Sequence, residues 1–343
     1  MREQGIVSPS ALEGERQFEA ALRPSRLDEF TGQPKVREIL AIAIEAARAR
    51  GEAMDHVLLH GPPGLGKTTL AAIVAQELGV SFDQTSGPIL QKKLDLTGIL
   101  SNIRDRQVFF IDEVHRLLPD VEEMLYSALE DYRVDIVIGA GAGARTHALP
   151  IPRFTAVAAT TRQGLVSAPM RARFGLVLRL NHYDQAEMTK IISRSARLLE
   201  VEIDEEGAGE IARRSRGTPR IGNRLLRRVR DYAQVRAAGR IDLDVAHKAL
   251  DLLEVDRFGL DETDRKIMMT ILANYKGGPV GLNTLAAGID EQADTIEEVY
   301  EPYLIQLGFL DRTPRGRVAT DRAWDYFRVP RRRSLTDQPT LFE

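Results

Sequence analysis

The chain has 343 residues with a formal net charge of −3, and 43% of its residues are hydrophobic while 28% are charged. This balance is typical of a folded globular protein with two or three domains, and the nearly neutral charge gives no global preference for nucleic acid. The absence of cysteine excludes disulfides, thiolate zinc sites and cysteine nucleophiles and favours a cytoplasmic location.

The chain begins with an expected N-terminal arm at residues 1–20, in which residues 1–15 lack the apolar run of a secretory signal. No stretch reaches the ~20 apolar residues that a membrane-spanning helix needs. Residues 16–180 alternate short apolar runs with amphipathic segments, the pattern of βαβ units around a parallel sheet. The expected buried strands are 57–59, 108–111, 155–159 and 176–180, and the expected helices are 36–47, 67–78 and 121–129. We therefore predict an α/β domain with a parallel sheet over residues 1–181.

Two features depart from this alternation. Residues 134–138 and 148–151 flank a turn rich in glycine and alanine, which predicts a hairpin at about 134–151 that projects from the sheet. After residue 181 the strand signals stop, and helical periodicity continues to about residue 255. We therefore predict a small all-helical lid domain at 182–255.

The pattern changes again at residue 256. Apolar spacing predicts helices at about 267–272, 282–287 and 294–307, and Pro302 should bend or break the last of them. Short strands at 309–310 and 318–320 then flank a Pro-Arg-Gly turn, which predicts a β-hairpin. Three helices followed by a hairpin form a winged helix, which we expect at 256–330. Residues 331–343 are expected to form a flexible tail.

The strongest motif lies between the first strand and its helix. Residues 61–68 read GPPGLGKT and satisfy G-x-x-x-x-G-K-[ST], the phosphate-binding loop, in the strand-to-helix context that confirms it. Gly64 and Gly66 allow backbone N–H groups to close around phosphates, and the helix N-terminus adds partial positive charge. The residues expected to bind ATP here are Gly64, Gly66, Lys67, Thr68 and Thr69. Lys67 would contact the β- and γ-phosphates and the Thr68 hydroxyl would ligate Mg²⁺.

A second motif follows the strand at 108–111. Asp112, at the end of this strand, can hold the Mg²⁺ shell together with Thr68. The adjacent Glu113 can orient and deprotonate an attacking water. An Asp-Glu pair some forty residues after the loop favours an ATP hydrolase over a kinase.

Beyond these motifs the chain resembles the AAA+ ATPases and, within them, the RuvB family of Holliday junction branch-migration motors. The resemblance covers about residues 22–329. The strings that carry it are LRP at 22–24, IDEVHRL at 111–117, LEDY at 129–132, AATTR at 158–162, RARFG at 171–175, RGTPR at 216–220, NRLLRRVRDY at 223–232, GGPVGL at 277–282 and YLIQLGFLDRTPRGR at 303–317. The loop alone is shared by many NTPases, but the ordered set is specific.

The resemblance assigns roles to further residues. It implies that Leu22 and Arg23 border the adenine and that Tyr183 contacts the nucleotide. Thr161 matches a sensor of the γ-phosphate, and Arg220 matches a second sensor in the lid. A separate group would lie where neighbouring subunits meet: Glu130, Asp131 and Tyr132 at the nucleotide-bearing interface, and Arg173 as an arginine finger that reaches into the neighbour's site.

Each of these arginines has an alternative interpretation. Arg173 could be a surface ion pair, and Arg171, two residues earlier, is a competing finger. Arg220 follows Pro219 at a helix start and could be structural. Residues 213–236 contain nine arginines and a single acidic residue. This cluster could be a solvated face, or it could serve the lid and subunit contacts rather than DNA.

The hairpin of the winged helix predicts the DNA contact. Arg312, Arg315 and Arg317 bracket its turn, where guanidinium groups can reach phosphates without reading bases. A motor that moves along any sequence should bind DNA in this way. The family resemblance points to Arg312 and Arg317 as DNA contacts.

The resemblance also implies partners. It implies a homohexameric ring around duplex DNA at a Holliday junction, with RuvA docked on the hairpin at 134–151 and with RuvC in the same process. The apolar residues Ile136, Ile138, Leu149 and Ile151 could instead face the sheet. The tail segment QPTLF at 338–342 resembles peptides that bind sliding clamps, although a chance match in a disordered terminus is the simpler interpretation.

The sequence thus predicts an ATP-dependent DNA translocase that drives branch migration in recombination and repair. A clamp-loader ATPase is one alternative, but its usual Ser-Arg-Cys finger is replaced here by Arg-Ala-Arg at 171–173. The other is a transcription regulator in which ATP gates a sequence-reading winged helix.

Overall fold

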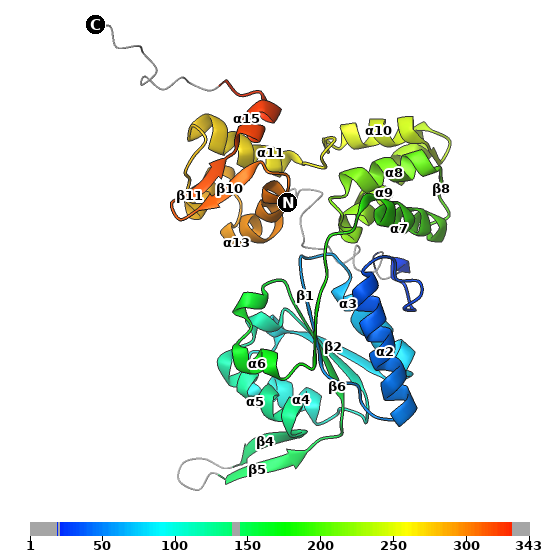
Figure 1. The fold of residues 1–343 in the computed structure, drawn as a ribbon, viewed down its shortest axis with the longest axis vertical. Helices are drawn as coiled ribbons and strands as arrows, with labels where there is room; N and C mark the ends of the chain where they lie inside the picture. The colour runs from blue at the N-terminus through cyan, green and yellow to red at the C-terminus, as the bar shows by residue number, and fades with distance from the viewer. Residues whose placement is uncertain (1–18, 20, 139–144, 331–343) are drawn as a thin grey trace, which may run out of the picture. The chain divides into compact units, whose positions relative to one another are not determined.

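The computed structural model describes Glu19, residues 21–138 and residues 145–330 (Figure 1). The predictions for the rest of the arm, the hairpin tip at 139–144 and the tail with its segment at 338–342 lie outside these residues. The described residues divide into two compact units, one formed by those up to residue 198 with 217–220 and the other by 199–216 with 221–330. No helix of the described residues is both long and apolar enough to cross a membrane.

The first unit is built on a five-stranded sheet with strand order β2-β3-β6-β1-β7, and its neighbouring strands pair in parallel. The strands are β1 (Val57–His60), β2 (Phe82–Ser86), β3 (Val108–Asp112), β6 (Thr155–Thr160) and β7 (Leu176–Arg179). Because both faces are covered, β6 is buried along its whole length, which is why such strands read as continuous apolar runs. The predicted α/β class and parallel sheet are confirmed.

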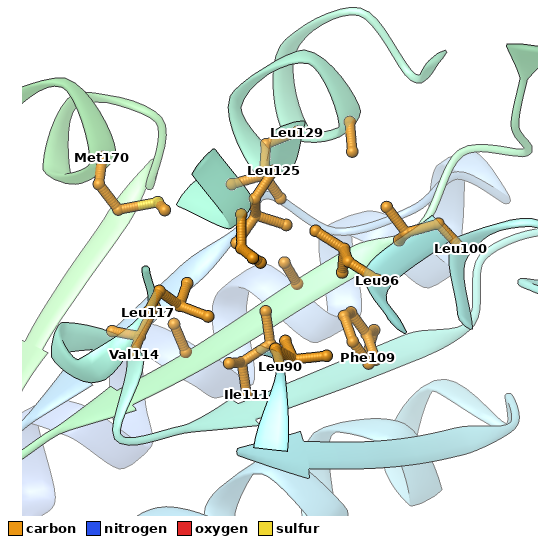
Figure 2. Close-up of a cluster of buried hydrophobic side chains, with 14 of the residues drawn as sticks. Leu90, Leu96, Leu100, Phe109, Ile111, Val114, Leu117, Leu125, Leu129 and Met170 are labelled. Atoms are coloured by element: carbon orange, nitrogen blue, oxygen red, sulfur yellow. The ribbon is translucent and has the colours of Figure 1, made fainter. Parts of the chain in front are cut away.

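Helices cover both faces of this sheet. They are α2 (Pro34–Arg50), α3 (Lys67–Leu78), α4 (Lys93–Leu100), α5 (Pro119–Glu130) and α6 (Ala168–Ala172), with short turns η1 (Gly87–Ile89), η2 (Val114–Arg116) and η4 (Gln163–Leu165). Helix α7 (Gln185–Leu198) follows the last strand. Figure 1 shows α2 and α3 on one face and α4 and α5 on the other. Figure 2 shows leucines of α4 and α5 above Phe109 and Ile111 of β3, in the apolar cluster that holds this strand in place.

Strand β2 and the short helices α4 and α6 were missed from the sequence. Strand β2 reads Phe-Asp-Gln-Thr-Ser and lies at an edge of the sheet with exposed side chains, so it carries no apolar run. Helix α4 is only eight residues long. Edge strands and short helices give the weakest periodic signals.

The predicted hairpin is present as β4 (Arg133–Ile138) and β5 (Arg145–Pro150), antiparallel with Val134 opposite Leu149. Its base belongs to the core, since Val134 and Ile151 are buried. Leu149 is exposed, and Ile136 is only partly buried against the cluster. The alternative that all these apolar residues face the sheet is therefore wrong for Leu149.

The second unit contains most of the lid. Its helices are α8 (Glu205–Arg214), α9 (Pro219–Arg236) and α10 (Leu243–Leu252), and the first two residues of α9 belong to the other unit. Two short strands, β8 (Glu202–Ile203) and β9 (Arg240–Ile241), pair in parallel. The expectation of helices alone was wrong for these two strands, which are too short to show a period.

The same unit contains the winged helix. Its elements are α11 (Glu262–Met269), η5 (Thr270–Asn274), α12 (Leu282–Ile289), α13 (Ala293–Thr295), η6 (Ile296–Tyr300), α14 (Glu301–Gln306), β10 (Leu310–Thr313), β11 (Gly316–Ala319) and α15 (Asp321–Phe327). Pro302 lies in the first turn of α14, directly after the wider turn η6, where its missing N–H is tolerated. Helical residues continue without a gap from Ala293 to Gln306, so the chain does not break at Pro302, and the irregularity is the wider turn η6 directly before α14. The sequence did not predict α15.

Candidate active site

The phosphate-binding loop connects β1 to α3 and contains three glycines with left-handed backbone. Gly61, Gly64 and Gly66 have φ values of +140°, +79° and +99°. A Cβ atom on Gly64 would lie 2.8 Å from Thr218 Cγ2 and 3.0 Å from Arg220 Cβ. Gly66 is the N-cap of α3 and has no side-chain cap, so the first N–H groups of the helix remain available to an anion. The loop is therefore a backbone cradle that only glycine permits at these positions.

Lys67 begins α3 and its side chain is buried. Its Nζ donates hydrogen bonds to the carbonyl oxygens of Gly61 and Pro62, both at 2.8 Å. Burial lowers the pKa of Lys67 to about 8, and the Asp112 carboxylate opposes that shift. The loop itself therefore holds the ammonium group in the cradle.

Asp112 and Glu113 lie where β3 ends. Burial raises the pKa of the Asp112 carboxyl, opposed by the hydrogen bond that Glu113 N donates and by the charge of Lys67. Glu113 has a left-handed φ of +48°, a strained conformation that persists where the surroundings impose it. Its carboxylate is bound by Arg116 Nη1 at 3.1 Å. The structure thus brings Asp112 to Lys67, whereas Glu113 points to a partner outside the cradle.

The end of β6 carries two threonines with different roles. Thr160 Oγ1 is paired with His115 Nδ1 at 2.9 Å and accepts from Arg162 N at 3.0 Å. Thr161 Oγ1 is buried and has no hydrogen-bond partner among the residues that the structure describes. A buried orphan hydroxyl requires an explanation such as a ligand. Because Gly61 N donates to Thr160 O, this hydroxyl follows the strand that flanks the cradle.

The residues predicted on the adenine side belong to the same unit. Leu22 and Tyr183 are buried, and Tyr183 Oη donates to Leu65 O at 3.0 Å. Burial lowers the pKa of Arg23, and the charged groups that act on it include Arg220 and Asp112. The structure therefore places Arg23 and Tyr183 beside the loop, whereas the described contact of Leu22 is the hydrogen bond that its carbonyl accepts from Arg194 Nη1 at 2.8 Å.

Arg220 approaches the loop from the RGTPR segment. Its backbone N donates to Gly64 O at 3.4 Å, and its Nε lies 3.2 Å from the Glu19 carboxylate. Its charge also acts on Lys67 and Asp112. Three cations, Arg23, Lys67 and Arg220, thus surround one space beside Asp112, which suits a polyanion. Thr68 and Asp112 are the residues that could hold a metal ion in it, because hydroxyl and carboxylate oxygens are ligands that Mg²⁺ accepts.

Arg173 lies apart from this cradle. Its Nη2 pairs with Glu130 at 2.9 Å, its Nη1 donates to Pro169 O at 2.7 Å, and its guanidinium carbon lies 4.4 Å from the centre of the Tyr126 ring. Within the described part of the chain, these contacts are with α5 and α6 and not with the loop. Asp131 and Tyr132 are not brought to the loop either: Asp131 pairs with Arg133.

Tyr132 packs against the core and is not brought to the cradle. Its ring packs edge-on against Phe154 at 6.1 Å, and Arg153 lies over it at 5.2 Å. Two contacts of the cradle were missed from the sequence, namely Glu19 on Arg220 and Phe30, whose ring would lie 3.1 Å from a Cβ on Gly66. The sequence feature that could have indicated these two residues is that they lie within a few positions of the LRP string at 22–24.

The three arginines of the winged-helix hairpin differ from one another. Arg315 is exposed in the turn. Arg312 is 55% exposed and pairs with Glu297 at 2.5 Å. Arg317, opposite Arg312 in the ladder, is only 9% exposed, and its guanidinium binds Glu301 at 2.5 and 3.1 Å. All three were predicted to contact DNA phosphates, and for Arg317 that contact would require its ion pair with Glu301 to open.

Comparisons with known proteins cover the whole described chain. The family model of the Holliday junction DNA helicase RuvB P-loop domain matches residues 22–180, that of the RuvB AAA lid domain matches 183–256, and that of the RuvB C-terminal winged helix domain matches 257–328. The Holliday junction branch migration complex subunit RuvB of Solibacter usitatus is 71% identical over 343 residues, all of both chains. Its counterpart from Koribacter versatilis is 65% identical over 94% of this chain and 90% of its own. The solved Thermotoga maritima RuvB Holliday junction branch migration motor is 52% identical, with a TM-score of 0.82 over 90% of this chain and all of that one.

Proposed function

The chain belongs to the RuvB family, the ATP-hydrolysing motors of Holliday junction branch migration, and on that premise we propose which residues perform the work and how. The clamp-loader and regulator alternatives are not favoured, since the relatives match over the full length and are branch-migration proteins. The finer proposals are a hexameric ring that encircles duplex DNA, with RuvA and RuvC as partners, in the cytoplasm.

Within one subunit, the cradle binds the triphosphate of ATP. Lys67 would leave the carbonyls of Gly61 and Pro62 for the β- and γ-phosphates, where the N–H groups at the start of α3 also bind. Thr68 and Asp112 would hold a magnesium ion, which neutralises phosphate charge when bound. Glu113 would orient the attacking water, and for this its pair with Arg116 has to open.

The observation that carries this proposal is the close approach of Arg220 to the loop. A side chain on Gly64 would collide with the segment at 218–220, so residues 218–220 and the phosphate cradle form one site. Arg220 can therefore sense a phosphate from the lid side, while the orphan hydroxyl of Thr161 senses it from β6. Both residues would contact the γ-phosphate, which ATP has and ADP lacks.

We propose that Arg173 acts on the site of a neighbouring subunit. Its ion pair with Glu130 and its contact with Tyr126 hold the guanidinium away from its own loop. A finger that neutralises transition-state charge across an interface contributes ~10³–10⁵ in rate in other NTPases. Glu130, Asp131 and Tyr132 would then line the interface, and hydrolysis would depend on ring assembly.

DNA would be held by phosphate contacts from the winged helix. Arg315 is exposed in the turn, and Arg312 could exchange Glu297 for a phosphate. Arg317 would contact DNA only after leaving Glu301, so we assign it the weaker role. RuvA would dock on the hairpin β4–β5, where Leu149 is exposed.

Mixed rings test the function and the finger together. We expect junction dissociation in the presence of RuvA, ATP and Mg²⁺, on junctions of unrelated sequence. Arg173→Ala and Glu113→Gln subunits should each be inactive alone and should recover part of the ATPase activity when mixed. Arg171→Ala is the matched control and should remain active. No recovery in any mixture would contradict a finger that acts in trans.

A further inference from the structure

Three arginines at or just after the end of α8 bind residues 255–259, which we call the linker between the lid and the winged helix. Each donates a side-chain hydrogen bond to a backbone carbonyl of that linker. The bonds are Arg213 Nη1 to Arg257 O at 3.1 Å, Arg214 Nη1 to Val255 O at 2.6 Å and Arg216 Nε to Gly259 O at 2.8 Å. A Cβ on Gly259 would lie 2.3 Å from Arg214 O, so the two backbones are in direct contact. The linker is thus fixed to the lid along five residues.

Of these three arginines, Arg216 also reaches helix α11 of the winged helix. Its two Nη atoms bind the two carboxylate oxygens of Asp264 in the first turn of α11. The same carboxylate accepts from Asp261 N at 2.9 Å as part of the capping box that begins the helix. The Arg216 guanidinium also lies 4.9 Å from the ring of Tyr303, whose hydroxyl donates to Phe258 O at 2.6 Å. One lid side chain therefore binds the start of α11, the linker and a residue of α14.

This junction is closed to water. The side chains of Arg216 and Asp264 are 2% and 0% exposed. To separate them would leave two buried charges without a partner, which is strongly unfavourable. Arg216 also holds a left-handed backbone with φ of +57°, directly before Gly217 at +62°, a conformation that a non-glycine residue keeps only where its surroundings impose it.

The place of Arg216 in the chain gives the junction a consequence. The next four residues, 217–220, belong to the unit that contains the phosphate-binding loop. There Tyr183 N donates to Gly217 O at 2.9 Å, and Arg220 N donates to Gly64 O at 3.4 Å. The residue bound to the winged helix is therefore four positions from the residue that contacts the loop.

We propose that Arg216 fastens the winged helix to the lid so that both move as one body when Arg220 responds to the nucleotide. Arg216 is then a positioning residue for DNA movement and has no part in ATP hydrolysis. This inference rests on the motor function proposed above. It makes the coupling between ATP hydrolysis and branch migration, rather than either activity alone, depend on one buried ion pair.

The first test measures the rigidity of the junction directly. Because the chain has no cysteine, spin labels can be attached to Leu252→Cys on α10 and Ile305→Cys on α14, which are 72% and 41% exposed. We expect a narrow distance distribution in the parent and a broad one in the double variant Arg216→Met/Asp264→Asn, which leaves no isolated buried charge. Arg240→Met, which removes an exposed ion pair with Glu202 in the same lid, should leave the distribution narrow.

The second test measures coupling. In the double variant the ATPase rate should stay within about twofold of the parent, while branch migration per ATP should fall about tenfold, the scale on which mutations weaken coupling between distant sites. Arg216→Lys keeps the charge and should recover part of the loss. A narrow distribution with unchanged migration per ATP would overturn the proposal. So would a proportional fall of both activities, which is the signature of a merely structural role.

The two tests also separate this inference from the motor function. If the parent chain fails to dissociate junctions with RuvA and ATP, the proposed function is wrong. The label distances still decide whether Arg216 makes the lid and the winged helix one body.

Discussion

The nucleotide site and the junction between lid and winged helix differ in how their key polar side chains are paired. In the nucleotide site, Thr161 Oγ1 is buried without a partner in the described chain, and backbone carbonyls alone bind the ammonium of Lys67. At the junction, Arg216 and Asp264 bind each other and their neighbours within the protein, although Oδ2 of Asp261 in the same capping box has no hydrogen-bond partner among the described residues. The two charged side chains that make this connection are paired with each other, whereas the Thr161 hydroxyl in the nucleotide site is left for a ligand. The difference teaches where this chain is expected to change with nucleotide and where it should stay rigid.

The largest expected effect lies at the junction. Asp264→Ala should lower the free energy of unfolding of the winged helix by about 3–5 kcal/mol, because it leaves the buried Arg216 uncompensated. The single tryptophan of the chain, Trp324, lies on α15 and reports this unfolding in urea. Glu202→Ala removes an exposed pair with Arg240 and serves as the control. Equal midpoints for the two variants would contradict a closed junction.

The junction also shows where inference from sequence ends. The glycine spacing of the loop, the Asp-Glu pair and the buried strands are local patterns, and the structure brings Gly64, Lys67, Asp112 and Arg220 into one site. The partner of Arg216 is 48 residues away, so no local pattern distinguishes this buried arginine from its solvated neighbours.

The same limit applies to Arg317. The sequence places it beside the turn of a predicted hairpin, and in the structure it lies opposite Arg312 in the ladder. Its burial depends on Glu301, sixteen residues earlier on α14. Edge strand β2 was missed for a different reason, since half-exposed polar residues form it through pairing with β3 rather than through their own propensity.

The next effect concerns the ammonium in the cradle. Lys67→Ala should lower the ATPase rate by about 10²–10³-fold, as expected when one preorganised charge is removed from a transition state. Lys266→Ala, which removes an exposed lysine paired with Glu262, is the matched control. A coupled assay of phosphate release measures both. Parental turnover in the Lys67 variant would refute the site.

The orphan hydroxyl should separate stability from activity. Thr161→Val keeps the shape of the side chain and removes a buried group that has no partner among the described residues. Thermal melting should therefore show no loss of stability, while the ATPase rate falls about 10- to 100-fold, as for a lost hydrogen bond to a charged group. Thr160→Val is the comparison, because its hydroxyl is bonded to His115 and should cost stability. A Thr161→Val variant that loses stability but keeps the parental ATPase rate would contradict a role for this hydroxyl in binding the nucleotide.

A smaller effect follows from the titration of the cradle. Burial lowers the pKa of Lys67 to about 8 without nucleotide, and bound phosphates should raise it again. Below pH 8 the ammonium is charged in both states, so Lys67 adds no pH dependence. Above pH 8 binding takes up a proton, and nucleotide affinity should fall by up to about tenfold per pH unit. Calorimetry in two buffers of different ionisation enthalpy measures the uptake. Lys67→Arg stays charged and should remove the pH dependence, whereas a flat parental affinity to pH 9.5 would contradict the assigned charge state.

The smallest effects are expected in the hairpin of the winged helix. There, too, a residue that is free to bind a ligand can be compared with one that is already paired within the protein. Arg315 is exposed and ready for a phosphate, whereas Arg317 is completed by Glu301. Arg315→Ala should therefore reduce the salt dependence of DNA binding, the slope of log affinity against log salt, by about 0.9 for one lost phosphate contact. Arg317→Ala should leave that slope nearly unchanged and instead lower the melting temperature, because it strands the buried Glu301. If Arg317→Ala reduces the slope as much as Arg315→Ala does, then Arg317 leaves Glu301 when DNA binds. The hairpin would then change its ion pairs with its ligand, as the nucleotide site does, and would not stay paired like the junction.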